Sequence, residues 1–391
     1  MQPTIKANLA AHGRDLRIDF ARGLANWFML LDHIPHNVVN LFTMRNFGFC
    51  GAIDLFALVS GYGVAILYGK MTLERGFIVA ATRIVKRSWQ LYAAHLVLFV
   101  IYINAIGWAA ARYAAPAILQ EYHIVGILND PVRVLMHGLL LESRPLNLDV
   151  LQMAIVLLLF FPVALAGLMR WPNLTILGSI ALYVVARHFG WGLPAFPAGS
   201  PYLNPFAWQL LFVLGAWFAL SGGKWVRALQ ELWLVRAVAL AYLVFALFIM
   251  IAAAHPAIAA LVPDALIKSF IPVDRDNLGP ARVLHILSIV LLFTWAVPAD
   301  WKGFDHKLMQ PVLKCGEEWL ASFCVGVFLS LAGYIVLITS PNSYLLQVLV
   351  SAAGLVLMTA VAYYVSWSKQ QDRVPRLSPA RAKQDHATAD R

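Results

Sequence analysis

The chain has 391 residues, of which 61% are hydrophobic and only 13% are charged, and its formal net charge is +10. An average soluble domain is about 45–50% apolar and about 25% charged. So few charges cannot cover the surface of a soluble protein of this size, which excludes a soluble enzyme, a disordered chain and a collagenous one. The composition predicts a polytopic membrane protein with an all-α fold, because lipid admits only helices or closed barrels and these apolar runs are too long for barrel strands.

Ten hydrophobic runs are close to the roughly 20 residues that a helix needs to cross the hydrocarbon core. We predict membrane spans at about 20–42, 49–69, 88–111, 149–169, 174–190, 205–221, 235–255, 282–298, 315–338 and 343–366. The chain then divides into an N-terminal segment (1–19), one transmembrane domain (20–366) and a polar, disordered tail (367–391). Two longer loops, about 112–148 and 256–281, lie on the side opposite the termini, and the first is expected to include a helix at the membrane interface.

Basic residues predict the orientation. An even number of spans places both termini on one side, and 21 of the 30 Lys and Arg residues lie in or next to the segments on that side, against 8 on the other. The positive-inside rule makes that side cytoplasmic. Because topology explains the charge, no nucleic-acid partner is expected. Three cysteines in apolar stretches are too few for a disulfide framework or a zinc site, so no metal is expected either.

The first predicted span is unusually polar, since it contains Arg22, Asn26, Asp32, His33 and His36. Each central Arg or Asp costs about 2.5–3.5 kcal/mol on insertion scales. Such residues usually face a bundle interior and mark function, although a polar network that fixes helix packing is the alternative. Arg22 and His33 are eleven residues apart, which is nearly three helical turns, so they share one face with Asn26 between them over about 16 Å.

That spacing suits a long donor with a phosphate head at Arg22 and a reactive end near His33. Pro35 removes a backbone donor and predicts a kink that opens the outer half of the span to a second substrate. In the second span Asp54 is left with two interpretations, orienting a histidine or capping a helix. The small residues of the run Ser60-Gly61-Tyr62-Gly63 predict close helix packing.

The ordered set of motifs resembles the type 3 acyltransferase superfamily of membrane proteins. Arg22, His33 and the run Ile53-Asp54-Leu55-Phe56 resemble its opening, and residues 83–92 resemble its basic motif. More specifically, the chain resembles the OpgC family of osmoregulated periplasmic glucan succinyltransferases over about residues 14–330. That pattern is carried by residues 14–23, 32–35, 45–49, 204–209, 277–285, 315–316 and 323–327. One departure is Glu317-Glu318, where a basic residue and a His-Ser pair are expected.

The resemblance implies transfer of a succinyl group from cytoplasmic succinyl-CoA to hydroxyls of a periplasmic glucan, in the inner membrane of a bacterium. Acyl-CoA is then a co-substrate, and no permanently bound cofactor is implied. His33 is the expected general base, because its ordinary pKa is near working pH, or else a transient acyl carrier. Asp32 or Asp54 would orient the imidazole. Asp54 is the easier partner, because adjacent helical residues point about 100° apart.

The remaining candidates fall into two groups. For the phosphates of the donor we expect Arg22, Asn26, Arg83 and Arg87, although the last two equally suit ordinary membrane anchoring. Contacts to the acceptor or the acyl group are expected from six polar residues: His36, Arg45, Asn204, Gln209, Arg282 and His285. A satisfied core histidine is the alternative interpretation of His285.

Other functions stay open. Acetyl transfer to another envelope glycan would use the same machinery. A proton-coupled transporter or flippase also suits intramembrane Asp and His, but no paired broken segments indicate the inverted repeats of such proteins. If the protein were a sensor or a scaffold, the polar cluster of the first span would have no function. Partners other than the donor, the glucan and the bilayer are limited to a possible second copy of the chain.

Overall fold

The computed structural model describes residues 3–11, 13–124, 130–143, 145–196, 203–341 and 343–373. This part of the chain is helical, with one isolated β-bridge and no strand, which confirms the all-α class. The α-helices are α1 (Pro3–Ala11), α2 (Leu16–Asp32), α3 (Ala52–Arg75), α4 (Phe77–Arg112), α5 (Ala117–Glu121), α6 (Pro131–Leu139), α7 (Asp149–Arg170), α8 (Pro172–Phe189), α9 (Pro205–Trp217), α10 (Gly223–Glu231), α11 (Trp233–Ala254), α12 (Pro256–Ala259), α13 (Asp264–Phe270), α14 (Pro280–Ala296), α15 (Gln310–Glu317), α16 (Trp319–Thr339) and α17 (Tyr344–Arg373). Shorter elements are the 3₁₀ turns η1 (Val38–Phe42), η2 (Met44–Asn46) and η4 (Lys302–Asp305), and the π-helical η3 (Phe218–Gly222).

Seven helices among the described residues are long and apolar enough to cross a membrane: α3, α4, α7, the continuous run from α9 to α10, α11, α16 and α17. The chain is thus a multi-pass membrane protein, although ten spans are not confirmed. Helix α14 is apolar but has only 17 residues. Helix α17 continues to Arg373, so residues 367–373 are not the disordered tail that we predicted. Residues 374–391 of that tail lie outside the described part.

Two predicted spans are interrupted. The span at 20–42 is not one helix, because α2 stops at Asp32 and the chain turns through His33 into η1. Pro35 explains this stop, since proline disfavours the helical conformation of the residue before it and cannot donate to the preceding turn. His36 then adopts a left-handed conformation with φ of +57°. The span at 315–338 divides at Glu318, between α15 and α16.

Glycines bring the central helices into backbone contact. A Cβ atom on Gly61 of α3 would lie 1.9 Å from the carbonyl oxygen of Phe212 on α9, so only glycine allows this approach. Likewise a Cβ atom on Gly316 of α15 would lie 1.7 Å from the carbonyl oxygen of Asp19 on α2. The predicted close packing at the small residues of α3 is confirmed at Gly61. These two crossings hold α2 and α3 at the centre of the bundle.

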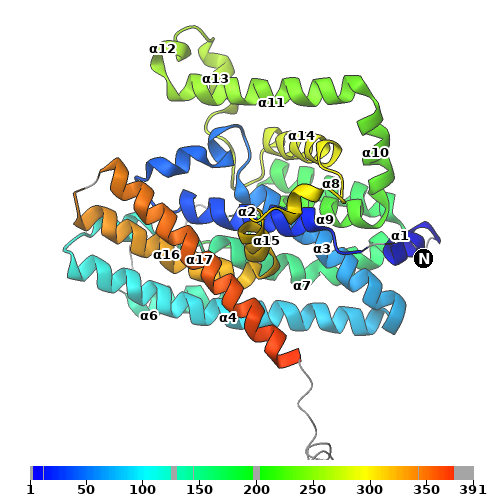
Figure 1. Ribbon diagram of the computed structural model, residues 1–391, viewed down its shortest axis with the longest axis horizontal. Coiled ribbons are helices and arrows are strands. Elements are labelled where there is room, and N and C mark those ends of the chain that lie inside the picture. Colours follow the sequence, from blue (N-terminus) through cyan, green and yellow to red (C-terminus); the bar gives the residue numbers. More distant parts are fainter. Residues whose placement is uncertain are drawn as a thin grey trace, which may run out of the picture.

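Helices α11 and α14 lie side by side along one flank of the bundle, and α10 connects this pair to the centre (Figure 1). The two long loops that we expected on the outside contain short helices, α5 and α6 in the first and α12 and α13 in the second. Helix α6 packs on α4, where the Tyr92 hydroxyl donates to the Leu139 carbonyl over 2.9 Å.

Candidate active site

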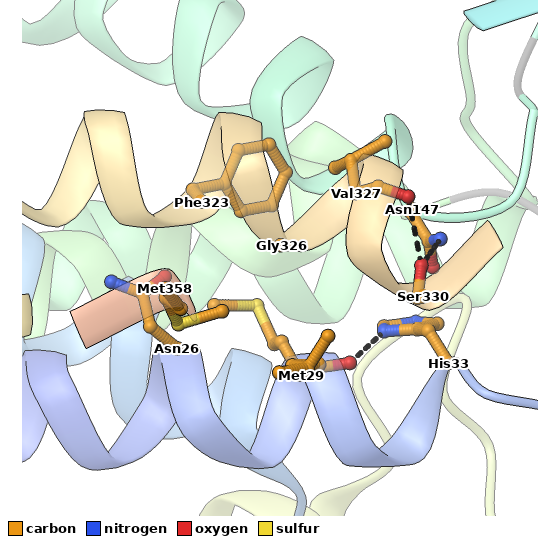
Figure 2. Close-up of a pocket in the computed structure, with 10 residues that line it drawn as sticks. Asn26, Met29, His33, Asn147, Phe323, Gly326, Val327, Ser330 and Met358 are labelled. Carbon is orange, nitrogen blue, oxygen red and sulfur yellow. Dashed lines mark hydrogen bonds between the residues drawn. The ribbon is translucent and has the colours of Figure 1, made fainter. Parts of the chain in front are cut away.

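His33 lies at the C-terminal end of α2 and is partly exposed. Its Nδ1 atom is 2.5 Å from the carbonyl oxygen of Met29 (Figure 2). A carbonyl only accepts hydrogen bonds, so Nδ1 carries the proton and the lone pair of the neutral imidazole is on Nε2. Within the described residues no protein group is hydrogen-bonded to Nε2. The backbone therefore fixes the imidazole in the tautomer that a general base requires.

Two cavities meet at His33. The first has room for about one water molecule, at about 10 Å³, and it lies between α2 and α16. Figure 2 shows Asn147 and Ser330 beside the imidazole at one end of this pocket. Asn147 donates to Ser330 Oγ over 3.0 Å, but its buried amide oxygen has no protein partner. The amide oxygen of Asn26 in the same pocket is also buried without a partner. These two oxygens are acceptors available to a hydroxyl near His33.

The second cavity, which we call the outer cavity, has a volume of about 310 Å³. It is lined by Asp32 and His33 from α2, by the segment from Arg45 to Ile53 and by Arg275 and Arg282. Arg275 is bound to Asp149 over 2.7 Å and Arg282 to Asp54. Arg45 is exposed, and among the described residues no carboxylate pairs with it. Arg45 is thus the guanidinium of this cavity that is available to an anionic ligand.

The two candidate acids have different surroundings. Asp32 lines the outer cavity and accepts a hydrogen bond from the Thr43 hydroxyl over 2.5 Å. Asp54 is completely buried, accepts from the Gly51 backbone N–H over 2.8 Å and is paired with Arg282. Two roles were considered for Asp54, orienting a histidine and capping a helix, and in the structure it caps the start of α3. Within the described residues neither carboxylate is hydrogen-bonded to the His33 imidazole, whose Nδ1 atom is bound to the Met29 carbonyl.

Three of the expected acceptor contacts are engaged elsewhere. Asn204 caps α9 through the Phe206 N–H at 3.1 Å and donates to the Trp191 carbonyl over 2.6 Å. Gln209 joins α9 to α8 through Ser179. His285 is buried with its Nδ1 atom 2.9 Å from the Cys50 thiol, as a satisfied core histidine would be.

His36 is exposed, and its ring centroid lies 6.3 Å from that of Tyr334. Of the six candidates for the acceptor or the acyl group, the outer cavity brings together Arg45 and Arg282. Sequence reasoning missed Asn147. Its left-handed backbone, with φ of +81°, and its contact with Ser330 are set by the fold and not by a local motif.

The expected donor residues lie along the inner half of α3. The Arg22 guanidinium packs against Gly63, where a Cβ atom would lie 2.2 Å from Nη2. Arg83 and Arg87 act electrostatically on Tyr68, five residues further along α3. Asn26 donates to the Trp319 carbonyl over 3.2 Å and shares the small pocket with His33. Of the face predicted for Arg22, Asn26 and His33, the small pocket therefore brings together Asn26 and His33, whereas Arg22 lines neither this pocket nor the outer cavity.

Glu317 and Glu318, the departure from the expected motif, do not line the outer cavity. Glu317 pairs with Lys314 at 2.6 Å and with Arg14 at 3.5 Å, and Glu318 pairs with Lys369. Partial burial raises the pKa of Glu317, but these cations outweigh burial and hold it below its usual value. Both carboxylates are thus neutralised near the start of α2, at the end opposite His33, and they do not repel an anion in the outer cavity. The described residues contain no cluster of three or more His, Cys, Asp or Glu suited to a metal ion.

A family model with the description OpgC protein matches residues 14–370 of the chain. The match includes His33, the outer cavity and both glycine crossings. No curated protein and no solved structure matches the chain.

Loss of Arg282 is expected to destabilise the fold strongly. In an Arg282→Gln variant the buried Asp54 carboxylate has no cation, a change that typically costs about 3–5 kcal/mol. The apparent melting temperature of detergent-purified protein should fall sharply, and a second change, Asp54→Asn, should recover part of the loss. Arg275→Gln is the matched control, because its ion pair with Asp149 is partly exposed and is worth about 0–1 kcal/mol. Equal melting temperatures for Arg282→Gln and Arg275→Gln would contradict this role of the buried pair.

Proposed function

The chain belongs to the OpgC family, and we propose that it is a membrane O-acyltransferase that moves a succinyl group from cytoplasmic succinyl-CoA to hydroxyls of periplasmic glucans. The family name implies an enzyme of the acyltransferase type. The observation that carries the proposal is the state of His33. Its Nδ1 proton is committed to the Met29 carbonyl, and the ring borders a cavity lined with cations.

In the proposed reaction, Nε2 of His33 accepts the proton of a glucan hydroxyl while the hydroxyl oxygen attacks the thioester carbonyl carbon of the donor. The carbon–sulfur bond then breaks, and the imidazolium returns the proton to the thiolate of CoA. The Met29 carbonyl stabilises the imidazolium through the hydrogen bond from Nδ1, which is the part that a carboxylate plays in a catalytic triad. Asp32 adds negative charge on the same cavity wall.

The charges of the outer cavity support a succinyl group over an acetyl group. A succinyl ester ends in a carboxylate, and a carboxylate in a partly enclosed site needs a cation or hydrogen-bond donors. Arg275 and Arg282 are held by Asp149 and Asp54, so Arg45 is the cation that we assign to the succinyl carboxylate.

The direction of transfer rests on topology. The N-terminal segment and the basic loops are proposed to be cytoplasmic, and the outer cavity with His33 then opens toward the periplasm. The acidic pair Glu317 and Glu318 lies near the start of α2, on the cytoplasmic side of this arrangement.

His33→Ala is expected to abolish transfer while the protein stays folded. Removing a general base typically costs about a hundredfold to ten-thousandfold in rate. Purified protein would be assayed with labelled succinyl-CoA in the presence and absence of glucan. His188→Ala is the control, since this histidine is exposed on α8, away from both cavities. Transfer at the rate of the unchanged protein by a well-folded His33→Ala variant would refute the base assignment.

Arg45→Gln should discriminate between the two donors. Hydrogen bonds to charged groups contribute about 1.5–3 kcal/mol, so kcat/KM for succinyl-CoA should fall about tenfold to a hundredfold, while kcat/KM for acetyl-CoA stays unchanged. Arg133→Gln, at an exposed arginine of α6, should change neither value. Mass spectrometry of glucans from cells with and without the protein gives a second test. Loss of acetyl groups with succinyl groups unchanged would refute the succinyl assignment and leave acyl transfer intact.

Two exposed leucines test the orientation. Leu261, between α12 and α13, is 84% exposed, and Leu308, before α15, is 73% exposed. A membrane-impermeant thiol reagent added outside should label Leu261→Cys and should label Leu308→Cys only after the membrane is opened. The reverse labelling pattern would overturn the orientation and the direction of transfer.

A further inference from the structure

A second large cavity lies at the other end of the α2–α3 pair. Its volume is about 310 Å³, and we call it the inner cavity. Apolar side chains from three helices form its walls: Ala21 from α2, Leu55 and Leu58 from α3, and Val290 and Phe293 from α14. None of the residues predicted from the sequence to bind the donor lines it. The site described above does not explain this cavity.

Cations line one part of the inner cavity. The Arg17 guanidinium is held by Asp15 at 2.7 Å and by the Val297 carbonyl at 3.3 Å. Arg227 of α10 is exposed, and among the described residues no carboxylate pairs with it. Both guanidinium groups act electrostatically on Tyr62, which also lines the cavity. Asp15 also lines the cavity and neutralises Arg17, so Arg227 is the cation at this end that is available to an anion. An apolar slot with such a cation at one end suits a ligand with an anionic head and a long, slender arm.

The inner and outer cavities follow one face of α2, where Ile18 and Ala21 line the inner cavity and Met29 and Asp32, each eleven residues further along, line the outer one. On α3, Ile53 lines the outer cavity and Leu55 the inner one, so both cavities approach the buried Asp54. On α14, Arg282 lines the outer cavity and Val290 the inner one. The Asp54–Arg282 ion pair thus joins α3 to α14 at the level where one cavity gives way to the other. Arg17 and His33 are sixteen residues apart, or about 24 Å at 1.5 Å per residue.

We propose that the inner cavity is the binding site for the phosphopantetheine arm of the acyl-CoA donor, with the phosphates of the head at Arg227. This proposal rests on the proposed function and adds the donor site to it. The arm lies between α2, α3 and α14, and its acyl end points along this face of α2 past Asp54 and Arg282 toward His33. Recognition of the head then comes from α10, and not from Arg83 and Arg87 of α4.

A thiol placed in the inner cavity tests this site without relying on catalysis. Thr294 of α14 lines the cavity, and its hydroxyl accepts from Gln230 over 2.7 Å. Alkylation of a Thr294→Cys variant by a maleimide would be followed with and without desulfo-CoA, which lacks a reactive thiol, and the unchanged protein would give the background from its native cysteines. We expect desulfo-CoA to slow alkylation at least tenfold. Lys302→Cys, an exposed position outside the cavity, should react at one rate throughout.

Paired arginine variants identify the cation. Arg227→Gln in the Thr294→Cys background should raise the half-protecting concentration of desulfo-CoA about tenfold. Arg236→Gln is the matched control, because this arginine stacks on Trp295 at 4.6 Å and does not line the cavity. An unchanged concentration in Arg227→Gln, or a loss of protection in Arg83→Gln alone, would overturn the assignment of the head.

The same preparations separate failure of this site from failure of the proposed function. Protein that transfers succinyl groups but shows no protection by desulfo-CoA would overturn the inner cavity as the donor site and leave the acyltransferase proposal standing. Protection by desulfo-CoA without any transfer would support the site and refute the proposed function. Protection by phosphatidylglycerol micelles but not by desulfo-CoA would overturn the proposal, because the cavity would then be a lipid site.

Discussion

The buried ion pair between Asp54 and Arg282 is the interaction on which the arrangement of the site depends. Asp54 is completely buried and Arg282 is 6% exposed, so each charge is tolerated only because the other compensates it. The same carboxylate accepts the Gly51 N–H and so begins α3. One pair therefore sets the first turn of α3, attaches the α11–α14 flank to the centre and stands between the two cavities. The cost of removing both charges from water is offset by their mutual attraction and by the hydrogen bond from Gly51.

A broken helix is the second constraint. A continuous helix through residues 20–42 would bury His33 on a regular face, with its backbone carbonyls satisfied four residues further on. Because Pro35 stops α2, the carbonyl of Met29 lies near an end where intrahelical partners run out, and the His33 side chain takes one of these places. The bond that satisfies the helix end is the bond that selects the imidazole tautomer. The end of α2 before Pro35 therefore also fixes the imidazole tautomer that the proposed reaction uses.

Much of this was predictable from local sequence. Composition and hydropathy indicate the membrane class, the polar residues of the first span indicate the functional helix, and the ordered motifs indicate the family, because all three signals lie within short stretches. Pairings between distant segments were not predictable. Helical geometry favoured Asp54 as the partner of His33, but Arg282, 228 residues away, binds it instead. Asn204 and Gln209 were predicted to contact a ligand because they are polar residues in or near membrane spans. In the structure Asn204 caps the start of α9, and Gln209 is hydrogen-bonded to α8.

The distribution of charge between the two ends of α2 extends this argument. Near its start, the carboxylates of Glu317 and Glu318 are paired with Lys314 and Lys369, so they contribute little net charge to the donor side. At its end, Arg275 and Arg282 of the outer cavity are paired with Asp149 and Asp54, which leaves Asp32 and the exposed Arg45 as the remaining charges. In the proposed reaction, the position of a succinyl carboxylate in this cavity is therefore set by Arg45, which attracts it, and by Asp32, which repels it. An acetyl group carries no such charge, so under the proposed function Arg45, and not His33, would distinguish the two donors.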